Sequence, residues 1–167
     1  MTMEQNWKQW VKKRKAWAMS DQEFAAVLKL PKEKRYTYFI KRVTGWRRYL
    51  WGLRRGENRW CVAGCVSHGH TIFPLWPHPR YAQEMAINKW SDASPEPIPL
   101  LQWLVKDMPE WEQQGWVVGV FLVRQGDGSL DGVVTPPRKL AEDIVEELMR
   151  YEDFDKFEKM LKYVGLI

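Results

Sequence analysis

Five short runs of aromatic and β-branched residues, most of them joined by short turns, limit the folds that this chain can adopt. They lie near 48–53, 60–66, 71–76, 116–123 and 132–135. Runs of this length and composition predict β-strands. Strands joined by short turns pair antiparallel, because a parallel pair needs a crossover connection. The sequence therefore predicts one antiparallel sheet of about five strands.

Segments with helical periodicity stand before, between and after these runs, so the predicted fold class is α+β, with helices covering the sheet. Ser20 and Glu23 have the spacing of a capping box at the start of the helix "DQEFAAVLKL". Pro31 suits the first position of the next helix, which Gly45 ends. The other segments with this periodicity are "PRYAQEMAINKW", "LLQWLVKDM", "PPRKLAEDIVEELMRY" and "FDKFEKMLKYV".

Proline residues mark several joints between the predicted elements. Pro109 lies beyond the end of "LLQWLVKDM", and "SDASPEPIP" is expected to be an extended connection. In "TIFPLWPHPRYAQEMA", three prolines lead the chain from a strand into a helix, so this segment is interpreted as a corner. His78, between two of these prolines, is a candidate cleft residue, because loops on a rigid scaffold often carry function.

The first eighteen residues predict a separate basic amphipathic helix. Its apolar residues share one narrow arc at helical spacing, and its lysines point elsewhere. The apolar set is Met3, Trp7, Trp10, Val11, Trp17 and Ala18, and the lysines are Lys8, Lys12, Lys13 and Lys15. Because a capping box follows at Ser20, we expect two units, a helical extension over 1–18 and a single α+β domain over 19–167.

Length and composition fit one ordinary globular domain. A chain of 167 residues is long enough to bury a substantial core. Its longest apolar stretch, "VVGVFLV", is far shorter than the roughly 20 residues of a membrane-spanning helix. The N-terminal region lacks the apolar centre of a secretory signal, and two cysteines are too few for a disulfide framework. We therefore expect a cytoplasmic protein with no transmembrane segment.

Charge is distributed unevenly along the chain, although the net charge is only +5. Residues 1–60 hold 16 Lys and Arg against 5 Asp and Glu, a balance of +11. Residues 61–167 hold 10 against 16, a balance of −6. Such an excess predicts a positive surface that attracts an anionic partner. The alternative is an ordinary solvated face that the acidic half neutralises.

Tryptophan is unusually frequent, with 11 residues in the chain. Strand and helix patterning is expected to bury several of them, because aromatic side chains dominate protein cores. This set is Trp60, Trp76, Trp90, Trp103 and Trp116. Trp7, Trp10 and Trp17 have no evident core, and Arg14 lies among them, where a cation can stack over an indole. The N-terminal helix therefore docks either on its own domain or on a partner.

Two clusters resemble metal sites, but each has a simpler interpretation. Cys61 and Cys65, with His68 and His70 close behind, are residue types that bind zinc. On one strand the two cysteines would lie about 13 Å apart, too far to share an ion, so they are interpreted as core residues. "DGSLDG" at 127–132 resembles the start of a calcium loop, but its twelfth position is Arg138. It is interpreted as a hairpin turn.

Catalytic motifs are not evident either. Cys65 or Ser67 beside His68 does not make a nucleophile and base, and the chain has no Gly-x-Ser-x-Gly elbow and no phosphate-binding glycine loop. No cofactor or metal is expected, and an enzyme is the less favoured interpretation.

Six segments occur in an order that is typical of one bacterial family. They are "KRYTYFIKRV", "YLWGL", "FPLWPHPRYA", "IPLLQWL", "VVGVF" and "GVVTPPRKLAEDI". This set resembles the family catalogued as domain of unknown function 2750. The resemblance covers roughly 20–151, so the residues before it form an N-terminal extension. The family has no established activity, cofactor or catalytic residue, so the resemblance assigns no role to any position.

Without a catalytic set, the sequence favours a non-catalytic module that binds another protein with an acidic surface, such as an accessory or toxin-neutralising (immunity-type) protein. The candidate binding residues are Trp7, Trp10, Lys12, Lys13, Arg14, Trp17, Arg47 and Arg48. Two alternatives stay open. One is a nucleic-acid-binding protein that uses the basic, Trp-rich N-terminal region. The other is an enzyme with a cleft near His68, His70 and His78.

Overall fold

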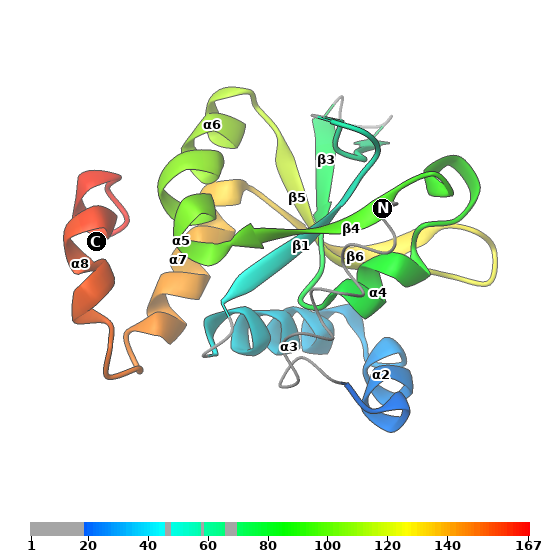
Figure 1. Cartoon of the computed structure of the whole chain (residues 1–167), viewed down its shortest axis with the longest axis horizontal. Helices are drawn as coiled ribbons and strands as arrows, with labels where there is room; N and C mark the ends of the chain where they lie inside the picture. The colour runs from blue at the N-terminus through cyan, green and yellow to red at the C-terminus, as the bar shows by residue number, and fades with distance from the viewer. Residues whose placement is uncertain (1–18, 46–47, 58, 66–69) are drawn as a thin grey trace.

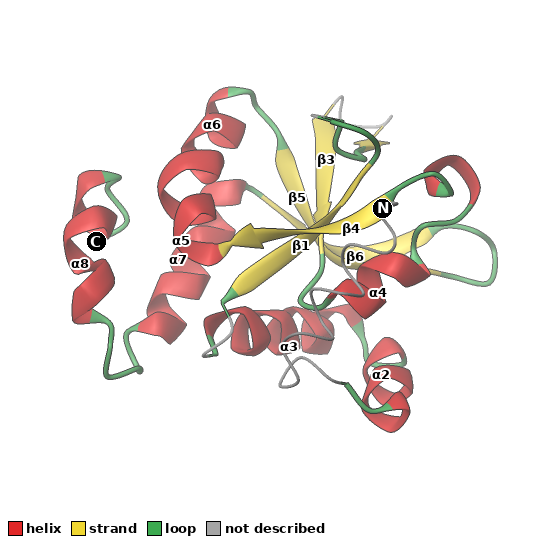
Figure 2. Cartoon of the chain, in the orientation of Figure 1, coloured by secondary structure: helices red, strands yellow, loops and turns green. Residues whose placement is uncertain are grey.

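The computed structural model describes residues 19–45, 48–57, 59–65 and 70–167, and the helix expected over 3–18 lies outside them. Figures 1 and 2 show how the helices and strands are arranged. The helical elements are α2 (Asp21–Leu28), α3 (Lys32–Thr44), α4 (Pro79–Glu84), η2 (Asn88–Trp90), α5 (Leu100–Gln102), η3 (Trp103–Asp107), α6 (Met108–Gln113), α7 (Pro137–Leu148) and α8 (Asp155–Tyr163). The strands are β1 (Tyr49–Arg54), β2 (Ala63–Cys65), β3 (His70–Leu75), β4 (Ser94–Pro99), β5 (Val117–Arg124) and β6 (Leu130–Thr135).

The described strands form two small sheets, so the expectation of a single five-stranded sheet is wrong. The larger sheet has the order β2–β3–β5–β6, and the smaller one pairs β1 with β4. A bridge joins them, because Trp51 and Trp76 exchange both of their backbone hydrogen bonds, at 2.9 and 2.8 Å. The fold is mixed α+β, as the sequence predicts.

One neighbouring pair of strands is parallel, which also departs from the expected antiparallel sheet. Strand β3 runs parallel to β5, with Ile72 opposite Val117. Between them the chain makes a long crossover through α4, β4 and the α5–η3–α6 segment. No short turn connects these two strands, so nothing in their connection forces them to pair antiparallel. Where a short turn does connect two strands, between β5 and β6, the pairing is antiparallel as expected.

Strand β4 occupies the segment that was expected to be a connection only. Its three prolines leave the pairing intact, because each occupies a position whose nitrogen faces away from β1. The backbone of Trp51 bonds to Trp76 on the far side of β1, so Pro97, which is opposite Trp51, turns its nitrogen away from β1. Pro95 and Pro99 have the same orientation, because alternate residues of a strand point their backbone groups the same way. The prolines therefore remove no hydrogen bond from the β1–β4 pair.

Local sequence signals locate most helices correctly. At the start of α2, Ser20 Oγ accepts a hydrogen bond from the Glu23 N–H at 3.1 Å, as the capping-box spacing predicts. Pro31 stands immediately before α3 rather than at its first position, and Gly45 caps its end. The segment "PRYAQEMAINKW" forms only the short α4 and η2, and not one continuous helix.

The helical segment after β4 continues through Pro109, which the sequence analysis places beyond its end. Helix α5 leads into η3, a π-helical turn, and then into α6, whose first turn contains Pro109. A proline removes one backbone N–H and crowds the preceding turn. The wider turn of η3 directly before it relieves that crowding, and π-turns are frequent at functional sites.

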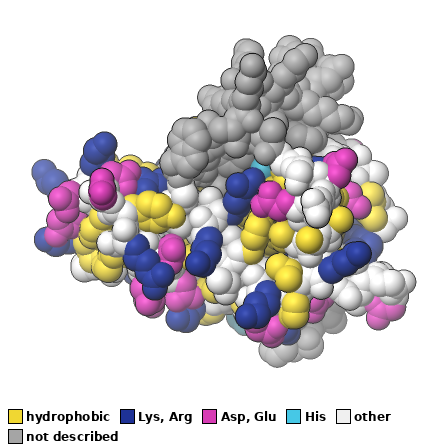
Figure 3. All heavy atoms as spheres, turned by 90° about the horizontal axis from the view of Figure 1, so that it is seen from below, with side chains coloured by type: hydrophobic (Ala, Val, Ile, Leu, Met, Phe, Trp, Pro, Cys, Tyr) yellow, Lys and Arg dark blue, Asp and Glu magenta, His cyan; other side chains and the backbone are white. Residues whose placement is uncertain are grey.

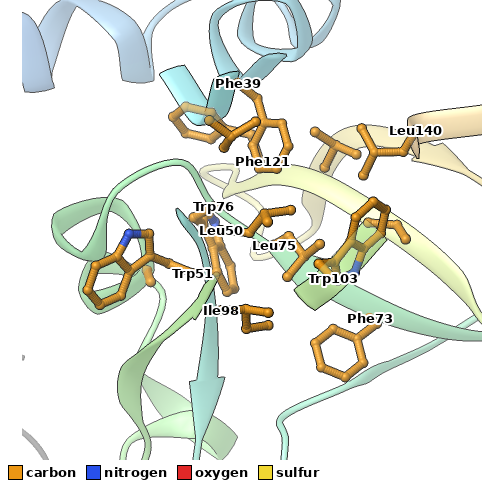
Figure 4. Close-up of a cluster of buried hydrophobic side chains, with 14 of the residues drawn as sticks. Phe39, Leu50, Trp51, Phe73, Leu75, Trp76, Ile98, Trp103, Phe121 and Leu140 are labelled. Atoms are coloured by element: carbon orange, nitrogen blue, oxygen red, sulfur yellow. The ribbon is translucent and has the colours of Figure 1, made fainter. Parts of the chain in front are cut away.

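The core lies between the strands and helices α3 and α7. Figure 4 shows its centre, where Phe39 of α3, Leu140 of α7 and Phe121 of β5 are fully buried. Helices α3 and α7 contact each other and β5, so they cover one face of the larger sheet. Three of the tryptophans that were expected to be core residues are indeed buried, namely Trp76, Trp90 and Trp103.

A buried arginine joins α3 to the β5–β6 hairpin. Arg35 is 2% exposed. Its guanidinium donates to the carbonyls of Leu30, Phe121 and Asp131, at 2.6, 3.2 and 2.8 Å, and to the Asp131 carboxylate at 2.9 Å. Phe121 has a φ of 54° and lies where the register of β5 and β6 shifts. Arg35 thus supplies a donor to a carbonyl beside this irregularity in the ladder.

We expect Arg35→Met to lower the free energy of unfolding by about 3 kcal/mol or more, because it leaves buried acceptors without a donor. Urea denaturation measures this change. Asp131→Asn should cost less, since the guanidinium keeps its carbonyl acceptors. Lys34→Met, at the exposed neighbouring position of the same helix, is the control and should stay within about 0.5 kcal/mol of the parent protein. Equal losses for the Arg35 and Lys34 variants would contradict the assigned role.

Candidate functional site

A hollow of about 570 Å³ lies where the turn after β1 meets the starts of β3 and β5. Two tryptophans and two arginines dominate its walls, so we name it the arginine–tryptophan hollow. It is lined by Arg55, Arg59, Trp60, Val62, Thr71, Phe73 and Trp116. Trp60 and Trp116 were both expected to be buried, but each keeps part of its side chain exposed.

The ring of Trp60 lies directly on the backbone of β1. A Cβ atom at Gly52 would come within 2.7 Å of this ring, so the close approach requires a glycine. The chain returns to β1 through a short turn, in which the Arg55 N–H donates to the Arg59 carbonyl at 2.8 Å. A further bridge pairs Arg54 with Trp60. This hairpin places the indole against Gly52.

Trp116 reaches the same hollow from the other side of the fold. The parallel register of β3 and β5 places it, just before β5, beside the start of β3. Its ring centroid lies 5.9 Å from that of the buried Phe73. Phe73 also contacts Trp60 at 5.5 Å and Trp111 at 3.8 Å between centroids. One buried phenylalanine therefore packs against both partly exposed indoles and restricts their movement.

The two arginines of the hollow differ in how far their charges are neutralised. Arg55 Nε lies 3.4 Å from the Asp92 carboxylate, and its Nη2 donates to the Lys89 carbonyl. Arg59 is exposed, and its guanidinium has no hydrogen bond or ion pair within the part of the chain that the structure describes. The uncompensated positive charge of the hollow therefore belongs to Arg59.

A second depression, of about 460 Å³, shares Trp60 with the hollow and lies between β4 and the α5–η3–α6 segment. We name it the carboxylate groove, after the acidic residues Glu96, Asp107 and Glu110 in its walls. Arg54 spans the boundary, with its guanidinium carbon 5.8 Å from the Trp60 ring centroid and its Nη1 3.3 Å from the Glu96 carboxylate.

Asp107 is the carboxylate of this groove whose acidity is altered. It lies half-buried at the end of η3 and accepts a hydrogen bond from Gln102 Nε2 at 3.3 Å. Burial raises the pKa of the Asp107 carboxyl, and the negative charge of Glu110 raises it further, against the opposing effects of Gln102 and Lys106. Carboxyl groups with raised pKa values often mark functional sites. Among the described residues, no three His, Cys, Asp or Glu side chains are grouped so that they could hold a metal ion.

The residues that sequence analysis selected for partner binding are mostly outside the described chain. These are Trp7, Trp10, Lys12, Lys13, Arg14, Trp17 and Arg47. Arg48 is described, and it makes an internal contact. Its guanidinium forms two hydrogen bonds with the Asp153 carboxylate, at 2.6 and 2.8 Å, and lies over the rings of Tyr151 and Phe157. Arg48 therefore fastens the segment after α7 to the start of β1.

The histidine and cysteine candidates have structural positions where they are described. His78 is buried and its Nδ1 accepts a hydrogen bond from the Arg80 N–H at 3.1 Å, which caps α4 and agrees with the interpretation of this segment as a corner. Its role in a cleft stays a prediction. His70 is exposed at the start of β3, and His68 lies outside the described residues. Cys61 is a buried free thiol, as expected of a core residue.

The first half of "DGSLDG" forms a hairpin turn, as its composition predicts, and its second half begins β6. Asp127 Oδ1 accepts hydrogen bonds from the N–H and the Oγ of Ser129, at 3.0 and 2.6 Å. Gly128 has a φ of 86°, a conformation that favours glycine. The Gln125 N–H donates to the Ser129 carbonyl at 2.7 Å and closes the turn between β5 and β6.

Sequence reasoning missed the arginine–tryptophan hollow as a site. Its residues come from three separate segments, and only folding brings them together. One local signal was present, since "RRGENRW" sets arginines and a tryptophan around a turn, where side chains are often exposed.

A model of one protein family matches residues 36–144 of the chain and carries the description "Protein of unknown function (DUF2750)". This range runs from within α3 to within α7 and contains every residue of the hollow and the groove. Comparison with curated proteins and with solved structures found no match. No helix among the described residues combines the length and apolar character needed to cross a membrane.

We expect Gly52→Ala to cost about 1–3 kcal/mol of unfolding free energy, because the new methyl group would overlap the Trp60 ring. Urea denaturation gives the cost, and the indole N–H resonance of Trp60 should shift. Gly64→Ala is the matched control in β2, where a Cβ meets no atom within 4 Å. An unchanged midpoint and an unchanged Trp60 resonance would show that the ring does not lie on Gly52.

Asp107→Asn should raise stability near pH 7. Burial disfavours the ionised carboxylate, so the pKa of Asp107 is higher in the folded protein than in the unfolded chain. The wild type therefore loses stability as the pH rises from the unfolded pKa through the folded pKa. Asparagine does not titrate, so its advantage should shrink as the pH falls toward the ordinary aspartate pKa of 3.8. Thermal melts at several pH values test this, with Glu142→Gln on the exposed face of α7 as the control. A gain that is independent of pH would contradict the explanation.

Proposed function

This chain belongs to the family described as proteins of unknown function (DUF2750), and we propose that it is a non-catalytic module that binds another protein with an acidic surface. The arginine–tryptophan hollow carries the proposal. Tryptophan and arginine are enriched among the residues that supply most of the energy in protein interfaces. Here two of each line one hollow that lies within the family-matched region.

The arrangement of the hollow suits recognition of an acidic partner. Trp60 and Trp116 present apolar area that buried Phe73 already holds in place, so little side-chain entropy is lost on binding. Arg59 adds a positive charge that no described residue neutralises. The basic N-terminal region, with Trp10 and Trp17, stays proposed as a partner-binding surface, as in the sequence analysis. An accessory or toxin-neutralising role is one setting for such a module.

The described charges, mixed on one face and often paired internally, support a protein partner over a nucleic acid. Contact with a nucleic-acid backbone needs a row of cations facing successive phosphates. On the face drawn in Figure 3, the Lys and Arg side chains are interspersed with Asp and Glu outside the grey region. Several arginines are paired internally, including Arg48 with Asp153, Arg80 with Asp21 and Arg138 with Glu112.

Affinity capture from a native lysate, followed by titration of the purified candidate partner, tests the proposal. Arg59→Glu and Trp60→Ala should each weaken the measured affinity at least about tenfold, as removal of an interface anchor does. Arg150→Glu is the matched control, because Arg150 is 68% exposed and far from the hollow in sequence. Deletion of residues 1–18 reports whether the N-terminal region contributes.

Two outcomes would overturn the proposal. One is a partner whose affinity is unchanged by both hollow variants. The other is capture that nuclease treatment abolishes and that falls log-linearly with salt, which would favour the nucleic-acid alternative.

A further inference from the structure

The arginine–tryptophan hollow combines one unneutralised cation with two supported indoles, and this combination specifies a ligand. We propose that it binds a short acidic peptide segment, with a carboxylate of the segment at Arg59 and a neighbouring apolar or aromatic side chain on Trp60 and Trp116. The inference rests on the proposed function and names the part of the partner that the hollow recognises.

The carboxylate position follows from the charges around the turn after β1. Arg55 is already engaged by Asp92 and the Lys89 carbonyl. The guanidinium of Arg59 has all its donors available to a ligand, as far as the described residues go. A planar guanidinium matches a carboxylate with two parallel hydrogen bonds. Glu57, exposed in the same turn, is the nearest acidic residue in sequence, and it forms no ion pair with Arg59.

The rings of Trp60 and Trp116 define where the apolar side chain of the peptide would bind. Trp60 lies against Gly52 and near Phe73, and the Trp116 ring centroid lies 5.9 Å from that of Phe73. These contacts leave part of each indole uncovered by the core. Val62, which is 38% exposed, adds an aliphatic rim. An aromatic or aliphatic side chain entering here would meet three apolar walls.

A single peptide carboxylate fits this site better than a nucleic-acid strand. Base stacking on the indoles would be compatible with a strand, but successive phosphates would need several free cations. Within the described lining, only Arg59 is free, since Arg55 is paired. The hollow, with a volume of about 570 Å³, can also hold one or two side chains together with their backbone.

Selection from a random dodecapeptide display library against the full chain tests the inference. The enriched peptides should contain Asp or Glu within a few residues of Phe, Tyr, Trp or Leu. A synthetic peptide with the consensus should bind the wild type, and Arg59→Gln should weaken it by about tenfold or more. Arg59 is exposed, so this change does not endanger folding. Arg150→Gln is the control and should bind as the wild type does.

A double-mutant cycle locates the carboxylate. The acidic residue of the peptide is changed to its amide, and both peptides are titrated against wild type and Arg59→Gln. If the two groups contact each other, the combined loss is smaller than the sum of the single losses. Additive losses would place the carboxylate elsewhere and overturn the inference.

Other outcomes also overturn it, and they are separable from failure of the proposed function. Enrichment of basic or uncharged peptides, or no enrichment, would exclude an acidic segment. Displacement of the peptide by a single-stranded oligonucleotide at physiological salt would favour nucleic acid instead. A protein partner that depends on Arg59 and Trp60, found without an acidic consensus, would keep the proposed function and reject this ligand.

Discussion

The paired backbone hydrogen bonds between Trp51 and Trp76 join the two sheets of this protein, and the arginine–tryptophan hollow lies where these sheets meet. Trp51 directs its backbone groups toward Trp76, so the next residues along β1 direct theirs toward β4. Gly52 and Arg54 then share one face of the strand, where Trp60 contacts them both. Phe73 of β3 then lies beside Trp60, with 5.5 Å between their ring centroids. The hollow is thus a product of how two sheets meet and not of either sheet alone.

Features fixed by neighbours in sequence were predictable, and those fixed by distant contacts were not. The Ser20 cap, the helix in "PPRKLAEDIVEELMRY" and the turn at Asp127 depend on residues close together in sequence, and the structure agrees with the predictions there. The parallel pairing of β3 and β5 spans a long crossover, for which no local pattern exists. Pro109 stays within a helix because a π-turn precedes it, and residue composition does not reveal such a turn.

The candidate site also combines features set by neighbours in sequence with features set by distant contacts. Patterning alone assigned Trp60 and Trp116 to the core, because a half-buried tryptophan on an element looks like a buried one in sequence. What distinguishes them is the space left between the turn and the start of β5, which only the assembled fold defines. Basic residues tend to be solvated, and Arg59 is exposed. Arg35 is buried instead, because distant carbonyls and the Asp131 carboxylate accept hydrogen bonds from its guanidinium.

The prolines of β4 have a consequence for how partners can approach. Every residue of β4 whose backbone faces away from β1 is a proline, namely Pro95, Pro97 and Pro99, so that side of the strand offers carbonyl acceptors but no N–H donors. Extension of a sheet by an incoming strand requires both. This edge therefore resists β-augmentation and edge-to-edge aggregation. A partner that approaches the β1–β4 sheet from this side must be recognised by its side chains.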